Sequence, residues 1–334
     1  MNRFILCLCL AMLAGAVQAQ NRRQLANFSQ FRHYYNPALT GHEGTVLRAA
    51  YRNQWTGFKD APKTILASGE LDLQDAQGPS RPFAARTLGR EQAGPTGARH
   101  GLGLILFHDQ FGPTKETQAV LSYGAGVQLS ERLSLRWGTG LSYTFYRLDG
   151  NSLTVDQVND PRFADVLGSE NRSGRADINI GLSLTGQHFY VGYALLDVTE
   201  GKVASSGNEL LGDFYKRRHV AQVGFRQSIT DLVGISLSGI YQHDSNQKSV
   251  TEGQVKAIYN NLFWVGGGYR HEMAYTLGAG LRLNQLGIGY TYETPTQDAR
   301  AIDKSTNEVT LSFFLNPAGQ SNGNGRKPSR LTIW

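Results

Sequence analysis

The chain has 334 residues, of which 39 are glycine and only 18% are charged, with a formal net charge of +6 at pH 7. Disordered chains are rich in charge and poor in aromatic residues. The 15 tyrosines and 15 phenylalanines therefore exclude a disordered chain. The basic excess is spread along the chain rather than clustered, which argues against a nucleic-acid-binding protein.

Residues 1–19 have the pattern of a secretory signal peptide. A short basic start precedes an apolar run from Phe4 to Val17, and residues 17–19 supply the small residues of a cleavage site. Both cysteines, Cys7 and Cys9, fall inside this segment. The mature protein is therefore expected to be exported and to have no disulfide, no thiolate metal site and no cysteine nucleophile.

Residues 20–44 form an N-terminal segment without a strand pattern. The segment carries four aromatic residues, Phe28, Phe31, Tyr34 and Tyr35. Aromatic side chains bury a large area when they pack. We therefore expect this segment to pack against the body of the protein that follows it.

From residue 45 onward the sequence alternates apolar residues with small or polar ones. Between Leu133 and Phe145, for example, most odd positions are apolar or aromatic and most even positions are small or polar. Such alternation indicates β-strands with one apolar face. The predicted strands are 46–55, 63–73, 101–108, 116–129, 132–147, 176–185, 188–196, 218–228, 232–242, 250–259, 262–270, 273–283, 286–294 and 307–315. Most have the length that a tilted strand needs to cross the hydrocarbon layer of a membrane.

The lengths of the connections favour a membrane barrel over a soluble sandwich. Connections after the fourth, sixth, eighth, tenth and twelfth strands are tight, whereas those after the third, fifth, seventh, ninth and thirteenth are longer and polar. Short turns at one rim and longer loops at the other are typical of outer-membrane barrels. The sequence thus predicts an all-β fold over residues 45–315. This fold is a transmembrane antiparallel β-barrel of about 14 strands in the cell outer membrane, with short periplasmic turns and long extracellular loops.

Two connections depart from this rule. Residues 74–99 are long where a tight turn is expected, and residues 270–272 are short where a loop is expected. The first of these stretches is too rich in glycine and proline for a regular element, so we interpret it as a periplasmic insertion. Residues 316–334 form a polar C-terminal tail, which we expect in the periplasm.

Placing the apolar phase against lipid directs charges of both signs into the lumen. The residues concerned are Arg48, Arg52, Arg136, Arg226, Lys256, Arg282, Glu70, Asp72, Asp177 and Glu308. Such charges can pair inside a filled barrel or line a water-filled pore. We favour pairing, because residues 20–44 could fill the lumen as a plug. The alternative for this segment is a foot on the periplasmic side.

The sequence gives little sign of enzymatic chemistry. The eight histidines show no H-x-x-x-H or H-x-H spacing, so no metal site is predicted, and no cofactor is expected. His243-Asp244-Ser245 has the residue types of a hydrolase triad, but a triad is a spatial arrangement rather than a run of neighbours. The protein is therefore expected not to be an enzyme. The glycines of Gly101-Leu102-Gly103 and Gly124-Ala125-Gly126 lie within strands and are expected to relieve crowding inside the barrel or to permit curvature.

Three stretches near the N-terminus form an unusual combination. Asn36-Pro37-Ala38-Leu39-Thr40-Gly41 is followed by Tyr51-Arg52-Asn53-Gln54-Trp55-Thr56-Gly57-Phe58 and then by Ala61-Pro62-Lys63-Thr64. Their order and spacing resemble the PorP/SprF family of outer-membrane proteins of the type IX secretion system of Bacteroidota. The resemblance extends over roughly residues 28–315, with less specific matches such as Asn307-Glu308-Val309-Thr310-Leu311-Ser312.

The resemblance implies a non-enzymatic barrel that helps the export or surface retention of cargo with a type-B C-terminal domain, such as gliding adhesins. It implies periplasmic type IX secretion components as further partners, beside the lipid of the outer membrane. The motif residues that are candidates for partner docking are Asn36, Pro37, Gly41, Tyr51, Arg52, Gln54, Trp55, Pro62 and Thr64. The alternative is that the motif only closes the first hairpin against the last strand.

Two other functions remain open from the sequence. A passive porin or small-molecule transporter would have an open lumen lined by Arg136, Arg226 and Arg282, and would prefer anions. An outer-membrane lipid hydrolase would require His243 and Ser245 to belong to a spatial triad.

Overall fold

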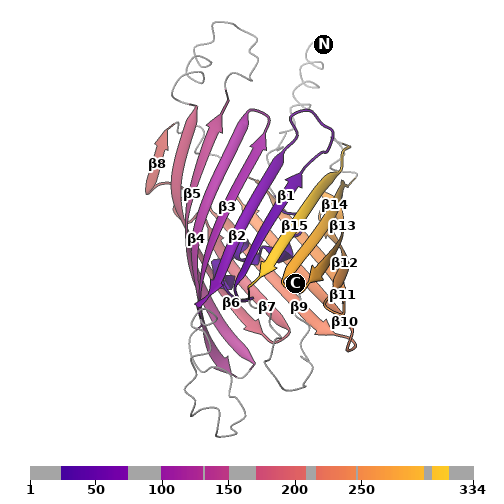
Figure 1. Cartoon of the computed structure of the whole chain (residues 1–334). Coiled ribbons are helices and arrows are strands. Elements are labelled where there is room, and N and C mark those ends of the chain that lie inside the picture. The colour runs from indigo at the N-terminus through magenta and orange to yellow at the C-terminus, as the bar shows by residue number, and fades with distance from the viewer. Residues whose placement is uncertain are drawn as a thin grey trace, which may run out of the picture.

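The computed structural model describes residues 24–73, 99–130, 132–149, 171–207, 216–245, 247–296 and 303–315, and within them one sheet closes on itself as a barrel (Figure 1). The predicted signal peptide, residues 20–23 of the predicted N-terminal segment, residues 74–98 of the predicted insertion at 74–99 and the predicted tail from 316 lie outside the described residues. Three short helices come first: η1 (Phe28–Gln30), α2 (Arg32–Tyr35) and η2 (Pro37–Leu39).

The strands then follow one another in antiparallel order. They are β1 (Val46–Asn53), β2 (Lys63–Asp72), β3 (Arg99–Phe111), β4 (Thr114–Ser130), β5 (Leu133–Leu148), β6 (Arg172–Gly186), β7 (Phe189–Leu196), β8 (Ala204–Gly207), β9 (Arg218–Ser228), β10 (Val233–Asp244), β11 (Gln247–Tyr259), β12 (Phe263–Arg270), β13 (Ala274–Leu283), β14 (Leu286–Pro295) and β15 (Thr306–Phe314).

Fourteen of these strands form the closed wall. β1 pairs with β2 on one side and with β15 on the other, from Val46 opposite Phe314 to Asn53 opposite Asn307. β8 stands outside the ring and pairs with residues 173–176, where β6 extends beyond β7. The prediction of an antiparallel barrel of about 14 strands is confirmed. Closure leaves no sheet edge in the wall, so every backbone group in lipid can be hydrogen-bonded.

Alternation along the strands separates the two faces of the wall. On β5, the outward Trp137, Leu141 and Tyr143 are 46%, 59% and 52% exposed, whereas the inward Arg136 and Ser142 are buried. A lipid-facing surface requires large apolar residues at the outward positions of the strands. In the described part of the chain, no helix combines the length and apolar character needed to cross a bilayer.

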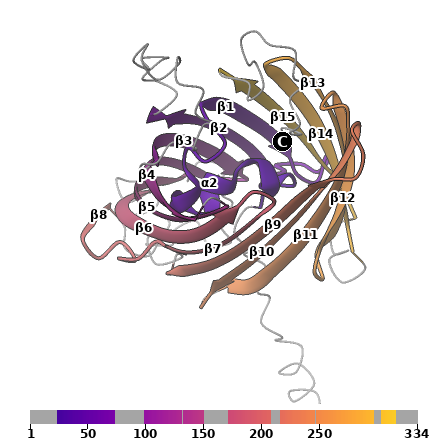
Figure 2. The same cartoon turned by 90° about the horizontal axis from the view of Figure 1, so that it is seen from below.

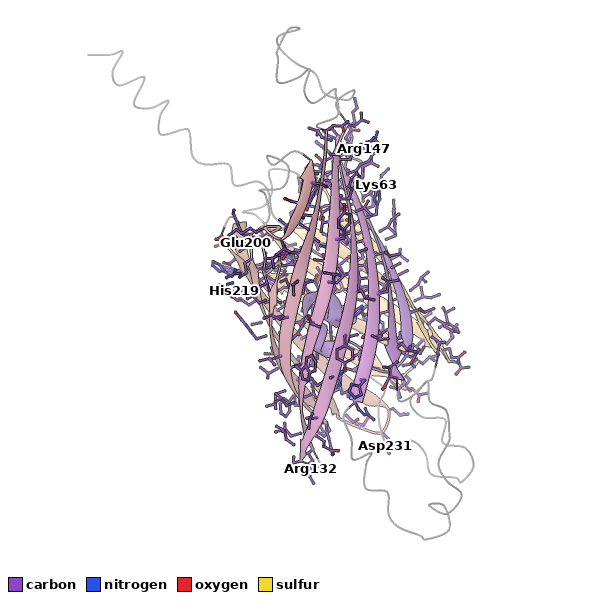
Figure 3. The ribbon with its side chains drawn as sticks, turned by 90° about the vertical axis from the view of Figure 1, so that its left-hand side faces the viewer. Lys63, Arg132, Arg147, Glu200, His219 and Asp231 are labelled. Atoms are coloured by element: carbon purple, nitrogen blue, oxygen red, sulfur yellow. The ribbon has the colours of Figure 1, made fainter. Side chains whose placement is uncertain are left out.

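The two ends of the barrel differ in their connections, and we name them the turn end and the loop end. The turn end holds the short connections, including those at Arg132 and Asp231, while Lys63 and Arg147 mark the loop end (Figure 3). In outer-membrane barrels the short turns are periplasmic and the longer loops extracellular. The loop end carries the connections 54–62, 149–171, 197–217 and 296–305.

The structure corrects two of the predicted long connections. β3 and β4 are joined through residues 112–113 and β10 and β11 through residues 245–246, because these strands continue to pair beyond the predicted ends. Gly112 has a φ of +53°, which glycine adopts readily and which allows the tight turn between Phe111 and Thr114.

Candidate functional site

Residues 24–44, which we call the inner segment, lie within the barrel, where α2 is seen inside the ring of strands (Figure 2). Its side chains Leu25, Phe28, Phe31 and Tyr35 are at most 2% exposed. Burying a side chain of this size stabilises a fold by about 1.5–3 kcal/mol. Burial also raises the pKa of the Tyr35 hydroxyl, which therefore stays neutral.

The lumen at this level holds two apolar clusters, and Tyr34 packs against both. The first consists of Leu25, Phe31, Ala50, Leu66, Ile105, Phe107 and Val120. The second consists of Phe28, Tyr35, Ala194, Leu196, Val220 and Ile240. The charged residues predicted in the lumen are therefore only part of its lining, because strands on two sides of the barrel also direct apolar residues inward against the inner segment.

A track of glycines lets the motif Asn36–Gly41 approach the wall. The glycines that meet this motif come from five neighbouring strands and are Gly101 and Gly103 on β3, Gly124 on β4, Gly138 on β5, Gly181 on β6 and Gly192 on β7. A Cβ added at Gly138 would lie 2.3 Å from the Pro37 carbonyl oxygen, and one at Gly181 would lie 2.0 Å from Oδ1 of Asn36. The crowding predicted at Gly101 and Gly124 is real, since an added Cβ would meet the Thr40 carbonyl oxygen at 2.6 and 2.9 Å.

Asn36 and Arg136 fix this motif by hydrogen bonds to its backbone. Oδ1 of Asn36 accepts from the N–H of Ala38 at 3.0 Å and so caps η2, which has Pro37 in its first turn. Arg136, predicted to face the lumen, donates from Nε to the carbonyl of Ala38 and from Nη2 to that of Thr40, each at 2.8 Å. Its guanidinium is thus bound to the inner segment.

Glu70 anchors the end of the inner segment next to β1. Its carboxylate accepts from the N–H of Gly41 at 2.9 Å and forms an ion pair with Arg48. Nδ1 of His33 lies 3.1 Å from the same carboxylate. Gly41 has a φ of +68°, and an added Cβ would lie 2.9 Å from the Cα of Gly101, so this position requires glycine.

Glu308 on β15 holds the other end of the segment. Its two oxygens accept from the backbone N–H groups of Ala26 and Asn27 at 2.7 and 2.9 Å. On β11, which is separated from β15 by β14, β13 and β12, Nζ of Lys256 donates to Asn27 Oδ1 at 2.6 Å and to Ser29 Oγ at 2.8 Å. Residues from two strands that are not neighbours in the wall therefore hold the same short stretch.

Buried ion pairs extend from Glu308 through residues of β1, β11, β12 and β14. Arg52 lies 2.8 Å from Glu293 and 3.5 Å from Glu308, and Arg270 lies 2.8 Å from Glu252 and 3.2 Å from Glu293. Each of these five side chains is at most 9% exposed. Alternating signs let each charge be compensated by a neighbour, which buried charges require.

The remaining predicted lumen charges serve the wall and its loops. Arg282 donates from Nε to the carbonyl of Asn284 at 3.1 Å and lies over the ring of Phe314 at 4.0 Å. Arg226 is half-buried on β9 and lines a small pocket near the turn end. Asp177 accepts from the N–H groups of Thr199 and Gly201, both at 2.8 Å, and so fixes the start of the loop that follows β7.

The second part of the motif divides between the two faces of the wall. Tyr51 faces lipid and is 45% exposed, whereas Arg52 is buried inside. Gln54 and Pro62 begin and end the connection between β1 and β2, where the N–H of Gln54 donates to the carbonyl of Pro62 at 2.9 Å. Inside the wall, Oγ1 of Thr64 donates to the carboxylate of Asp109.

Trp55 lies at the loop end in the first hairpin, with a φ of +52°. Its ring packs against Phe111 at 5.7 Å and Phe58 at 6.5 Å between centroids, and its N–H donates to Oγ1 of Thr306 at 3.3 Å. The next residue, Thr56, donates its N–H to the carbonyl of Ser305 at 2.8 Å. The first hairpin is therefore fixed against the start of the last strand, as the alternative interpretation of the motif requires.

The family model for the type IX secretion system membrane protein PorP/SprF matches residues 17–313. The chain belongs to the PorP/SprF family. Membership associates it with type IX secretion and with the outer membrane. No significant match is found among curated proteins.

The PorP/SprF chain is also similar in structure to other barrels. Omp33 of Acinetobacter baumannii has 8% identity and a TM-score of 0.44, covering 81% of this chain and 97% of its own. A FadL homologue of Pseudomonas aeruginosa has 11% identity and a TM-score of 0.45, with coverages of 84% and 93%. The monoaromatic hydrocarbon channel CymD has 13% identity and a TM-score of 0.45, with coverages of 84% and 90%. Likeness at this level does not extend to function.

In this PorP/SprF barrel, His243 and Asp244 face opposite sides of the wall and do not form a triad with Ser245. His243 faces outward, and its Nδ1 lies 2.9 Å from Oγ of Ser249, whereas Asp244 faces inward and is buried. Across the described ranges, no group of three or more His, Cys, Asp or Glu residues could hold a metal ion.

Sequence reasoning missed the apolar contacts inside the lumen. Leu66, Ile105 and Phe107 occupy inward positions of β2 and β3, which the alternation assigns to polar residues. Apolar residues in the polar phase of neighbouring strands were the available signal. They indicate that something apolar lies inside the barrel, and the aromatic residues of the inner segment are its match.

Proposed function

We propose that this PorP/SprF protein is a non-enzymatic barrel that helps to export, or to retain at the cell surface, cargo with a type-B C-terminal domain such as a gliding adhesin. The observation that supports this role most is the filled lumen. The inner segment is held by Glu70, Arg136, Lys256 and Glu308, and its apolar side chains are buried. A barrel of this kind offers its ends, rather than a channel, to its partners.

The loop end is the surface that we assign to cargo. The family motif supplies both the residues that seat the inner segment and the hairpin that carries Trp55 and Phe58. Phe58 is 48% exposed, and exposed aromatic residues on a fixed loop are common anchors in protein interfaces. Under this proposal the inner segment acts as a plug that keeps the hairpin in place, and the turn end faces the periplasmic components of the secretion system.

A pull-down from solubilised membranes tests the proposal. The full-length protein is expected to recover a tagged type-B C-terminal domain, and the double variant Trp55→Ala with Phe58→Ala is expected to recover much less. Phe263→Ala is the matched control, because Phe263 is an exposed aromatic residue at the turn end. Absence of cargo with the wild-type protein contradicts the proposal. If the double variant recovers as much cargo as the Phe263→Ala control, the hairpin is not the docking surface.

A passive porin is the second candidate, and the same observation disfavours it. An open pore lined by Arg136 would require its guanidinium to release the carbonyls of Ala38 and Thr40. The inner segment would also have to expose Phe28 and Phe31 to water. Planar bilayers containing the purified protein are therefore expected to stay silent. Stable, large, anion-preferring channels favour the porin instead.

A further inference from the structure

One row of outward side chains near the loop end is unusually basic. The strand pairing places Lys63, Gln110, Lys115, Arg147 and Arg172 directly opposite one another on β2 to β6. The flanking residues Thr64, Asp109, Glu116, Tyr146 and Ser173 are buried inside the barrel. Since neighbouring residues of a strand point to opposite faces, the row faces outward. Lys63 and Arg147 both lie at this end of the barrel (Figure 3).

The row lies just beyond the lipid-facing band. The next outward residues toward the middle of the barrel are Ile65, His108 and Thr117, and beyond them lie Leu106 and Leu121, which are 50% and 59% exposed. Two residues along a strand span about 7 Å. The cations are therefore placed where apolar side chains give way to the headgroup layer of the outer leaflet, which lies on the side of the extracellular loops.

The neighbouring positive charges of the row would be stabilised by a bound anion. Lys115, Arg147 and Arg172 are direct neighbours on adjacent strands, and like charges in this position destabilise a sheet. Within the described residues, none of the three, nor Lys63, forms an ion pair. The row is also confined to one side of the barrel, because it continues through Asn53 to Asn307 and Tyr292, which are uncharged.

A cavity at one end of the row has the chemistry of a sugar site. The first hairpin overhangs β1 to β3 and encloses about 300 Å³, with Lys63, Asn53, Gln110, Asp60 and Phe58 among the lining residues. Amide and carboxylate groups can bond sugar hydroxyls, and the Phe58 ring can pack on the apolar face of a sugar. The ammonium of Lys63 adds three hydrogen-bond donors to this set.

We propose that this row and its cavity bind the phosphorylated sugar headgroup of a glycolipid in the outer leaflet of the outer membrane. Lys115, Arg147 and Arg172 bind the phosphates, which removes their mutual repulsion. Lys63 and the polar residues of the cavity bind the sugar end. The bound lipid covers the outward face of β2 to β6 at the loop end.

Native mass spectrometry of the full-length protein in detergent tests this assignment. The probes are diphosphoryl lipid A, dephosphorylated lipid A and phosphatidylglycerol. The wild-type protein is expected to bind diphosphoryl lipid A about tenfold or more tightly than either other lipid, because each basic residue near a charged headgroup adds to the attraction. Raising the salt concentration is expected to weaken this binding.

The quadruple variant Lys63→Gln, Lys115→Gln, Arg147→Gln and Arg172→Gln is expected to lose about tenfold or more of the affinity for diphosphoryl lipid A. Its matched control is Arg99→Gln with Arg132→Gln, two exposed cations near the turn end, which should bind as the wild-type protein does. Heat-modifiable migration on gels verifies that each variant folds, and Lys115→Gln alone, expected to show a smaller loss, replaces the quadruple variant if that one does not fold.

Equal binding by the basic-row variant and the wild-type protein overturns the proposal. So does wild-type binding that ignores the phosphates, or binding of phosphatidylglycerol as tight as that of lipid A. If the variant keeps lipid A but loses a co-purifying membrane protein, the row is a protein interface instead. Binding is measured without cargo, so this outcome is independent of the proposed role in secretion.

Discussion

Oε2 of Glu308, on the last strand, accepts a hydrogen bond at 2.7 Å from the backbone N–H of Ala26, although the two residues lie 282 positions apart in the chain. Oε1 of the same carboxylate accepts from Asn27 at 2.9 Å. One side chain of the wall thus satisfies two buried donors of the inner segment. The strand that closes the barrel also holds the segment that fills it.

Glu308→Gln tests this relationship. The amide that replaces the carboxylate keeps one acceptor oxygen and turns the second into a donor, which faces a backbone N–H. A buried donor left without its acceptor costs about 1–3 kcal/mol, so we expect a lower unfolding temperature. The measurement is heat-modifiable migration of the purified protein. Glu272→Gln, at an exposed carboxylate of the loop end, is the control and should unfold as the wild-type protein does.

The wall could be derived from the sequence because alternation is a local pattern. The predicted strand 46–55 corresponds to β1 at Val46–Asn53, and 286–294 corresponds to β14 at Leu286–Pro295. The predicted ends at residues 108 and 116, between β3 and β4, were wrong, because strand pairing beyond the membrane does not need apolar residues. Phe111 and Thr114 still pair across Gly112.

The candidate site could be derived only in part. The sequence singled out the motif residues and the inward phase of Arg136 and Glu70, but it did not give their partners. Arg136 binds the carbonyl of Ala38, which lies 98 positions away, and no local pattern encodes such a contact. Gly138 and Gly181 were equally hidden, because a glycine in a strand has several explanations and only the position of η2 selects one.

Gly138→Ala is expected to disturb the inner segment. The new Cβ would lie 2.3 Å from the carbonyl oxygen of Pro37, a backbone atom that cannot rotate away. Overpacking of this kind typically costs about 1–3 kcal/mol. We expect a lower unfolding temperature and faster proteolysis within residues 24–44. Gly253→Ala is the control, since a Cβ there would meet nothing within 4 Å. Identical proteolysis of both variants would argue against close packing of η2 on β5.

A cross-link between the inner segment and the wall asks whether the segment must move during function. Oγ1 of Thr40 lies 3.0 Å from Oγ of Ser122 on β4, so Thr40→Cys with Ser122→Cys is expected to form a disulfide. The only native cysteines, Cys7 and Cys9, lie in the predicted signal peptide. If the inner segment is a permanent filling, the oxidised protein retains cargo as well as the reduced protein does. Retention that is lost on oxidation and regained on reduction would mean that the segment moves.

Arg52→Met compares a buried ion pair with an exposed one. Removing the guanidinium leaves Glu293 with Arg270 alone and takes away the cation 3.5 Å from Glu308. Breaking a buried pair by removing one partner typically costs about 3–5 kcal/mol, whereas an exposed pair contributes about 0–1 kcal/mol. Lys202→Gln is the exposed counterpart, because Lys202 pairs with Glu200 at 3.4 Å and is 78% exposed. We expect the unfolding midpoint in urea to fall clearly for Arg52→Met and to stay near the wild-type value for Lys202→Gln. A small change in the unfolding midpoint for Arg52→Met would mean that water reaches the carboxylates of Glu293 and Glu308. The lumen would then be less tightly filled around Arg52 than its contacts indicate.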